Sequence, residues 1–530
     1  MNDRPADTEP TGWEPELAQL RRRHDAARAM GGEEAITRWH DEGRLTARER
    51  IEAFLDAGSF QELGALAGKG RYQADGELES FTPSNCVMGT GELDARRLVV
   101  VADDFTLRGG SSEATVSDKW VYAERMAYEF RMPLVRFVDS AGGSVKLLEQ
   151  MGRTKIPGYA LWPFVQLLGV TPVASIAFGS CAGLGAARLL ASHFSVMIRA
   201  KSYVFAAGPP VVRQGLGQEV TKEELGGASV HTKASGCINN AAADEREALD
   251  QVRRFLSYMP RNVWALPDRV ATADDAGRHE EGLNTIIPRD RRKGFDPRRI
   301  LQLVCDQGSI FEMSPSFGGS LVTVLARLDG HAVGAMINNP AVMGGALTRA
   351  AAQKMERFVD LCDTFHLPVV NFVDQPGTMI GVEAERAGTL LAAARADCAI
   401  EQASVPWVSV VIRRAFGLAG SMLGPWHGPS GTSLNHRFAW PSARWGSIPI
   451  EGGVAAAYRR EIAAAPDPEA RRTELEQRYH HYASPFRTAE AFGVVDIVEP
   501  AATRALLCGW VRDAYEVTRT QLGPRARTMR

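Results

Sequence analysis

The chain repeats its own sequence, and this duplication constrains the fold more than any other feature. The segment FRMPLVRFVD at residues 130–139 returns as FHLPVVNFVD at residues 365–374, so that Phe, Pro, Phe, Val and Asp recur in the same order and spacing. The offset between these segments also joins Gly109-Gly110 with Gly344-Gly345, Lys119 with Lys354, and Gly142 with Gly377. Ordered matches of this kind indicate a gene duplication, so we expect two copies of one domain.

Two further blocks extend the repeat. DAGSFQE at residues 56–62 returns as DQGSIFE at residues 306–312 at a larger offset, and Phe178-Gly179 matches Phe416-Gly417 at nearly the first offset. The larger offset of the early block predicts about 15 additional residues in the first copy, between this block and the next. A chain of 530 residues, 45% of them hydrophobic, can form two large domains. We predict an N-terminal extension at 1–30, domains at 31–270 and 271–515, and a tail at 516–530.

Within each copy the pattern alternates between strand and helix. Strands are predicted at residues 98–102 and 332–337, helices at 117–130 and 350–365, and short strands that end in Asp139 and Asp374. This alternation predicts an α/β fold, in which ligands bind beyond the carboxyl ends of the strands. Turns of small residues are expected at these ends, at residues 139–143, 179–183, 374–377 and 417–420.

Small residues let a substrate oxygen approach the backbone N–H groups, as in an oxyanion hole. Tight packing of helix on strand selects the same residues, so the sequence leaves both readings open. A third reading concerns Cys181, because Gly179-Ser180-Cys181-Ala182-Gly183 resembles a nucleophile elbow with cysteine in place of serine. A buried, unreactive cysteine is the favoured interpretation.

Composition excludes several classes of function. Lys and Arg number 61 against 63 Asp and Glu, so a basic surface for nucleic acid is not expected. The seven cysteines form no C-x-x-C pair, which favours a reducing, cytoplasmic compartment and no zinc site. Neither a P-loop nor a dinucleotide fingerprint is present.

Residues 156–187 carry no charge, but Pro163 and Pro172 interrupt them. We therefore expect a helix, a buried strand and a turn in this segment rather than a membrane span.

Several longer stretches match one known family. They are RLTARERI at 44–51, DFTLRGG at 104–110, FVDSAG at 137–142, ELGGA at 224–228, FVDQPG at 372–377 and RRAFG at 413–417. Through them the chain resembles the carboxyltransferase (β) subunits of biotin-dependent acyl-CoA carboxylases, such as propionyl-CoA and methylcrotonyl-CoA carboxylases, over residues 44–507. The resemblance implies an α/β chain of two homologous crotonase-like (ClpP/crotonase) domains in tandem, the first binding the acyl-CoA and the second biotin.

The resemblance also implies an enzyme that transfers CO2 from carboxybiotin to the α-carbon, or a vinylogous carbon, of an acyl-CoA thioester. Two oxyanions develop, and each needs hydrogen-bond donors. The implied catalytic residues are Ala141, Gly142 and Gly143 at the thioester oxygen, and Leu418 and Ala419 at the ureido oxygen of biotin. The implied substrate-binding residues are Gly109, Gly110, Gly179, Ser180, Cys181 and Ser421. The implied biotin-binding residues are Ala207, Gly208, Gly377 and Gly417.

Cofactor and partners follow from the same resemblance. The chain lacks a Met-Lys-Met biotinylation motif, so biotin is expected on a separate carrier, with a biotin carboxylase and biotin carboxyl carrier α subunit as partner. A dimer-based homo-oligomer, commonly a hexamer, is implied, without metal, nucleic acid or membrane.

The chain departs from the family pattern at three places. Leu418 stands where the family has Gly, Ser421 matches neither of the two residues that are common in the family at this position, and residues 423–429 form an unusual insertion. These departures leave the acyl group open, with a decarboxylase subunit or a non-catalytic scaffold of a carboxylase complex as alternatives.

Overall fold

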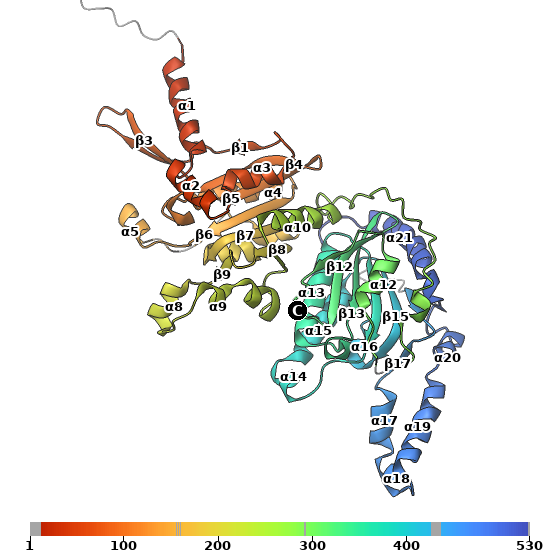
Figure 1. Cartoon of the computed structure of the whole chain (residues 1–530). Coiled ribbons are helices and arrows are strands. Elements are labelled where there is room, and N and C mark those ends of the chain that lie inside the picture. Colours follow the sequence, from red (N-terminus) through yellow and green to blue (C-terminus); the bar gives the residue numbers. More distant parts are fainter. Residues whose placement is uncertain are drawn as a thin grey trace, which may run out of the picture. The chain divides into compact units, whose positions relative to one another are not determined.

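A computed structural model describes residues 12–154, 156, 158–159, 161–290, 293–425 and 436–527. The chain divides into two compact units (Figure 1). Unit 1 is Met1–Ala228 with Ala242–Asp250, and unit 2 is Ser229–Ala241 with Gln251–Arg530. One eight-stranded mixed sheet belongs to each half of the chain, so the predicted α/β class with two copies in tandem is confirmed. The residue boundaries predicted for the domains stay predictions.

The first sheet has the strand order β1-β4-β5-β6-β7-β8-β10, and β9 pairs with β7. Strands β4 and β5 are antiparallel, whereas β5, β6, β7 and β8 run parallel. The parallel strands are buried almost throughout, which explains their uncharged sequences. The strands are β1 (Gln61–Leu63), β4 (Cys86–Leu93), β5 (Arg96–Asp103), β6 (Leu134–Ser140), β7 (Val173–Ala182), β8 (Phe194–Ile198), β9 (Tyr203–Phe205) and β10 (Asn240–Ala242).

The second sheet repeats this topology, with the order β11-β12-β13-β14-β15-β16-β18 and β17 on β15. Its strands are β11 (Phe311–Met313), β12 (Leu321–Leu328), β13 (His331–Asn338), β14 (Val369–Gln375), β15 (Trp407–Phe416), β16 (His436–Ala439), β17 (Arg444–Gly446) and β18 (Asp496–Ile497). A separate hairpin of β2 (Gly68–Tyr72) and β3 (Leu78–Pro83) lies between β1 and β4 in the chain. The second copy has only a short link between β11 and β12 at this point, so the hairpin accounts for the predicted additional residues.

Strand pairing corrects one block of the repeat. Leu134 pairs with Val173 in the first sheet, and its counterpart Val369 pairs with Trp407 in the second, so Val173 of β7 corresponds to Trp407 of β15. Counting along the two strands from this pair brings Gly179 level with Arg413. The match of Phe178-Gly179 with Phe416-Gly417 is therefore wrong, and it is a coincidence of two Phe-Gly pairs.

The helices predicted at 117–130 and 350–365 are confirmed as α4 and α13. Thr46 caps α3 through a reciprocal capping box with Glu49, and Thr348 caps α13. In the first half the helices are α1 (Glu14–Arg28), α2 (Glu33–Asp41), α3 (Ala47–Phe54), η1 (Arg108–Gly110), α4 (Ser117–Glu129), α5 (Lys146–Met151), α6 (Phe164–Leu168), α7 (Leu184–Leu190), α8 (Pro209–Leu216), α9 (Lys222–Gly226), η2 (Val230–Ala234) and α10 (Glu245–Tyr258). In the second half they are α11 (Leu283–Ile286), α12 (Pro297–Val304), η3 (Met343–Gly345), α13 (Arg349–Thr364), α14 (Val382–Arg386), α15 (Thr389–Gln402), α16 (Gly417–Ser421), α17 (Ile450–Ala457), α18 (Arg459–Ala464), α19 (Pro468–Tyr482), α20 (Pro485–Glu490), η4 (Pro500–Ala502) and α21 (Thr503–Arg519).

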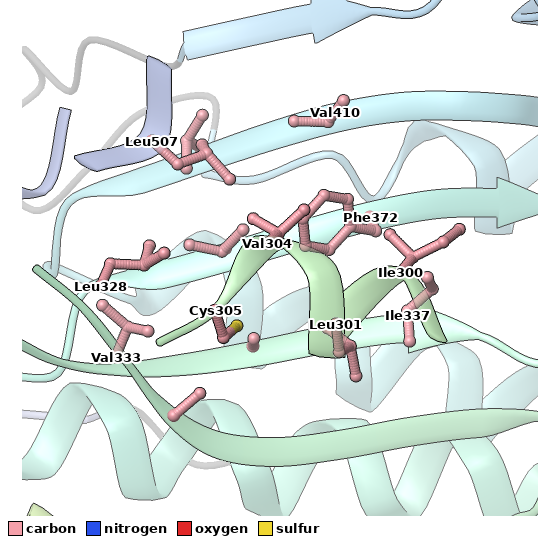
Figure 2. Packing of buried hydrophobic residues seen from close by; sticks show 14 of the residues in the cluster. Ile300, Leu301, Val304, Cys305, Leu328, Val333, Ile337, Phe372, Val410 and Leu507 are labelled. Carbon is pink, nitrogen blue, oxygen red and sulfur yellow. The ribbon is translucent and has the colours of Figure 1, made fainter. Parts of the chain in front are cut away.

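The core of unit 2 shows how helix spacing matches the sheet. Ile300, Leu301 and Val304 share one face of α12, and Figure 2 shows them among side chains of the strands. Their partners include Ile337 of β13, Phe372 of β14 and Val410 of β15, with Leu507 contributed by α21. This packing fixes the strands whose carboxyl ends carry the candidate site.

The uncharged segment at 156–187 forms α6, the buried strand β7 and the start of α7. The turn predicted at 179–183 is corrected: residues 179–182 continue β7, and only Gly183 makes the turn, at φ +55°. The strand is longer than expected because Ser180, Cys181 and Ala182 pair with β9. No helix among the described residues has the length and apolar character that crossing a membrane requires.

Candidate functional site

Loops of the same construction follow β6 and β14. The amide of Ser112 donates to the carbonyl of Gly142 at 3.1 Å, and the amide of Leu347 donates to that of Gly377 at 3.0 Å. Gly142 and Gly377 are thus structural counterparts, as the repeat predicts. Gly142 has φ +85° and lies against the backbone of Ala182, so a larger residue would be strained there.

The amides of the first loop differ in their availability. The Ala141 amide donates to the Gly109 carbonyl at 3.3 Å, and the Gly142 amide donates to Ser140 Oγ at 3.3 Å. Both bonds are long for N–H donors and therefore weak. The exposed Gly143 amide makes no hydrogen bond to the residues that the structure describes.

Gly110 and Gly179 lie in close contact with this loop, whereas Gly109 has no close neighbour among the described residues and is favoured as glycine by its φ of +60°. A Cβ on Gly110 would lie 2.4 Å from the Asp139 carbonyl oxygen, and a Cβ on Gly179 would lie 2.2 Å from Asp139 Oδ1. Only glycine fits such approaches. At these positions the packing reading of the small residues therefore holds.

Cys181 is fully buried between these elements. Its thiol donates to the Val138 carbonyl at 3.4 Å, and burial, the largest cause, raises its pKa well above the ordinary value. A thiolate nucleophile needs the opposite environment, exposed and electropositive. The hydrolase interpretation of the Cys181 motif is therefore wrong, and the favoured reading of an unreactive cysteine is supported.

Two short helices begin at matching glycines beyond the third parallel strand of each copy. The alignment of β7 with β15 pairs Gly183 with Gly417, which have φ +55° and +63°. It likewise pairs Leu184 with Leu418, and Gly185 with Ala419, in the first turns of α7 and α16. The amides of Leu184, Gly185, Leu418 and Ala419 make no hydrogen bond within the described part of the chain.

These four amides form two equivalent pairs of unpaired donors. First-turn N–H groups lack partners within their own helix and carry its positive potential, which suits an oxygen with developing negative charge. The sequence prediction does not include Leu184 and Gly185, because the resemblance implied the thioester donors at residues 141–143. An alignment on the shared Gly-Leu pairs, Gly183-Leu184 and Gly417-Leu418, could have found them.

The aspartates that end β6 and β14 have different surroundings. The Asp374 carboxylate accepts four hydrogen bonds, at 2.6–3.0 Å, from Arg413 and Arg414. The Asp139 carboxylate accepts none from the described residues. Arg50 Nη1 and Arg44 Nη1 lie 3.7 and 3.9 Å from Asp139 Oδ2.

The pKa of Asp139 follows from this difference. Burial is the largest cause and raises its pKa to about 7, against the lowering effect of Arg50 and Arg44. Because neither guanidinium is hydrogen-bonded to the carboxyl, the loss of hydration outweighs both cations. In unit 2 the two arginines that bind the aspartate, Arg413 and Arg414, belong to β15. The aligned positions of β7 in unit 1 are Gly179 and Ser180, so Asp139 has no such partners on the neighbouring strand.

A cation lies at the end of β7 in unit 1. Lys222 Nζ is 3.4 Å from Ser180 Oγ and 5.8 Å from the ring centroid of Tyr203. The capping box between Thr221 and Glu224 holds the helix that carries it. Lys222 has no carboxylate within 4 Å in the described structure, so it can contact an anion.

The predicted biotin-binding residues lie in different units. Ala207 and Gly208 precede α8 in unit 1, whereas Gly377 and Gly417 belong to unit 2. Ser421 is exposed, and its Oγ donates to the Leu418 carbonyl at 2.7 Å. Part of the insertion, residues 426–429, lies outside the described residues. The described residues contain no cluster of His, Cys, Asp and Glu that could hold a metal ion.

Comparison with known proteins shows the family and the fold of the chain. The chain matches the carboxyl transferase domain family over residues 38–528. A propionyl-CoA carboxylase carboxyltransferase subunit from Haloferax mediterranei is 36% identical over 502 residues, covering 94% of this chain and 96% of its own. A methylmalonyl-CoA decarboxylase α subunit from Veillonella parvula is 31% identical, covering 90% and 91%. The structure of transcarboxylase 12S, a hexamer with hydrolysed methylmalonyl-coenzyme A bound, is similar with a TM-score of 0.86 and 31% identity, covering 98% and 99% of the two chains.

Proposed function

The chain belongs to the carboxyl transferase family and is an acyl-CoA carboxyltransferase with two crotonase-like domains, and we propose that it carries the thioester hole in unit 1 and the biotin hole in unit 2. One observation carries the proposal: each unit has, at a matching helix start, two backbone amides without a partner among the described residues. They are Leu184 and Gly185 in α7, and Leu418 and Ala419 in α16. A reaction that develops two oxyanions needs two such pairs.

The residues of α16 fit biotin. The ureido group presents a neutral carbonyl oxygen, which two convergent N–H groups can bind without a charged side chain. Ala419 is buried, whereas Leu418 is 43% exposed, so its side chain borders the entrance without covering the amides. Biotin, carried by another subunit, supplies the carboxyl group and the base that takes the α-proton. Gly377 and Gly417 shape the loops around this position.

In unit 1 the amides of Leu184 and Gly185 polarise the thioester carbonyl and stabilise the enolate oxygen. Gly143 contributes a third free amide from the opposite loop, while Ala141 and Gly142 hold that loop in place through their weaker bonds. Gly109, Gly110 and Gly179 keep the loop close to the strand ends. Ser180 and Lys222 then lie where a phosphate of coenzyme A can accept hydrogen bonds.

Short-chain acyl-CoA thioesters are the proposed substrates. The relative from Haloferax is a propionyl-CoA carboxylase subunit, and that from Veillonella is a methylmalonyl-CoA decarboxylase subunit. Propionyl-CoA and methylmalonyl-CoA are therefore the first pair to test, with Ser421 near the proposed acyl position. The decarboxylase relative also makes the reverse reaction a second candidate, since both directions use the same two holes.

Assembly is part of the proposal. The transcarboxylase 12S structure is a hexamer, and we expect a dimer-based homo-oligomer in which unit 1 of one subunit works with unit 2 of another. Such an arrangement would bring Ala207 and Gly208 to the biotin site. The partners would be a biotin carboxylase and a biotinylated carrier. A cytoplasmic location stays a prediction from cysteine usage.

Fixation of labelled bicarbonate tests the function. The complex is isolated from its host and assayed with ATP and short, branched and long acyl-CoAs, with and without avidin. Avidin-sensitive fixation with one acyl class supports the carboxylase. Release of CO2 from methylmalonyl-CoA without ATP-dependent fixation would favour the decarboxylase. Neither activity, from a complex that retains its biotinylated protein, would leave only the scaffold role.

A further inference from the structure

Unit 2 contains a cavity of about 710 Å³ at the carboxyl ends of its strands. Its walls come from α11 and the loop after it, from the ends of β14 and β15, from the segment joining β16 to β17, and from α17, α19 and η4. Figure 1 shows α17 and α19 extending from the end of the sheet that carries β17. The volume is that of a small-molecule site, about 300–1,000 Å³.

The cavity is the second copy's counterpart of the acyl-CoA edge in unit 1. Ser180 pairs with Tyr203 there, and Arg414 pairs with Arg444 at the same position in unit 2. Arg413, Arg414 and Arg444 all line the cavity. At matching positions, unit 1 therefore has small and aromatic residues, whereas unit 2 has arginines that line a cavity.

From this we propose that the cavity is a second ligand site, which takes a nucleoside phosphate. None of the residues assigned above to the thioester, biotin or coenzyme A lines this cavity. The proposal depends on the proposed function only for the comparison between the two edges.

Two cations are available to the phosphate. Arg413 is fully engaged, through Nε and Nη2 with Asp374 and through Nη1 with the Lys293 carbonyl. Arg414 uses Nε and Nη2 for Asp374 and the Gly344 carbonyl, and its Nη1 makes no hydrogen bond to any described residue. The exposed Arg289 forms no hydrogen bond or ion pair with the described residues. Arginine donors of this kind bind phosphate strongly.

The other walls suit a nucleoside. Glu499 accepts a hydrogen bond from Asn284 at 3.1 Å, and Glu451 pairs with His480 at 3.3 Å. The carboxylates of Glu499 and Glu451 can accept hydrogen bonds from ribose hydroxyls or a base amino group. Phe416, Ile287 and Ile450 provide apolar surface for a flat base. We expect the phosphate of the ligand to lie toward Arg289 and Arg414.

Calorimetric titration of the full chain with ADP tests the site, in the wild type and in three charge-reversal variants. Arg289→Glu removes a cavity cation, Arg299→Glu reverses an exposed arginine that lines no part of the cavity, and Lys222→Glu alters the edge of unit 1. We expect saturable binding of ADP, weakened at least about tenfold by Arg289→Glu alone. Adenosine should bind more weakly than ADP, and inorganic phosphate should compete with it.

Competition between coenzyme A and ADP for the site that Arg289→Glu weakens would also support the proposal. This result would identify the nucleotide end of coenzyme A as the nucleoside phosphate that binds there. The proposal is overturned if ADP does not bind, if adenosine binds as tightly as ADP, or if Arg289→Glu and Arg299→Glu behave alike. Binding lost only in Lys222→Glu would equally overturn it. Bicarbonate fixation by the same variants separates the two proposals: ADP binding without any acyl-CoA reaction would refute the function and leave this site standing.

Discussion

Replacement of Asp139 by Asn should stabilise unit 1 at alkaline pH. The carboxyl is buried, accepts no hydrogen bond from the described residues, and has a pKa of about 7 against an ordinary value of 3.8. A raised carboxyl pKa means that the folded state keeps a proton which the unfolded state has released. The stability contribution is therefore full below about pH 4 and is progressively lost as the pH rises through about 7.

The size of the effect follows from the two pKa values. Linkage between them costs the folded state about 2.6 kcal/mol on going from pH 5 to pH 8, because each pKa unit is worth about 1.4 kcal/mol. Asn at position 139 has the same shape and cannot ionise. The variant should therefore gain about 2.6 kcal/mol relative to the wild type over this interval.

Hydrogen exchange of peptides that span β6 measures this quantity locally. The intrinsic exchange rate cancels when both proteins are compared at one pH, and about 2.6 kcal/mol corresponds to about an 80-fold change in relative protection. Asp374→Asn provides the matched control, since it removes a carboxylate that binds two arginines. It should destabilise β14 by about 3–5 kcal/mol at both pH values.

Equal protection ratios at pH 5 and pH 8 would contradict a raised pKa for Asp139. A loss of stability in Asp139→Asn at pH 8, like that expected for the control, would contradict it as well. Either result would mean that Arg44 and Arg50 hold Asp139 as a carboxylate in spite of their 3.9 and 3.7 Å separations from it.

The remaining predictions concern catalysis and binding. Ala419→Pro removes one donor in the first turn of α16 and should lower kcat by about 10²–10³ without changing KM for acyl-CoA, whereas Leu418→Ala, which keeps its amide, should remain active in the fixation assay. Leu184→Pro should lower the rate of enolate formation, followed as α-proton exchange of the acyl-CoA, and Leu184→Ala should not; equal rates in both would remove α7 from the thioester hole. Lys222→Glu should raise KM for acyl-CoA about tenfold while Lys222→Arg retains it, and an unchanged KM would exclude the phosphate contact. Cys181→Ala should keep carboxylation, because the thiol lies outside the proposed donors.

Sequence patterns predicted the architecture because a duplicated core repeats its hydrophobic strands. The segments ending in Asp139 and Asp374 share their aromatic and apolar positions, and their buried strands require uncharged sequences wherever they occur. The number of additional residues in the first copy could also be predicted, from the difference between the two offsets. Their structure, the hairpin of β2 and β3, could not be predicted, because the second copy has no matching segment for comparison.

The sequence predicts the thioester donors at residues 141–143, and this stays a prediction, because the structure shows only which amides lack partners among the described residues. Backbone amides carry no side-chain signal, so Ala141 and Leu184 look equally suitable until their hydrogen bonds are known. Strand pairing favoured Leu184, by showing that Leu184 and Leu418 occupy the same position in two sheets.

The amino-acid sequence was sufficient to predict the duplication, the α/β class and the small residues that a ligand can approach closely, since all three depend on local residue type and spacing. The folded structure was needed to show which amides lack partners among the described residues, why Asp139 and Asp374 differ, and that arginines line a cavity in unit 2. These properties depend on hydrogen-bond partners and burial supplied by segments far apart in the chain.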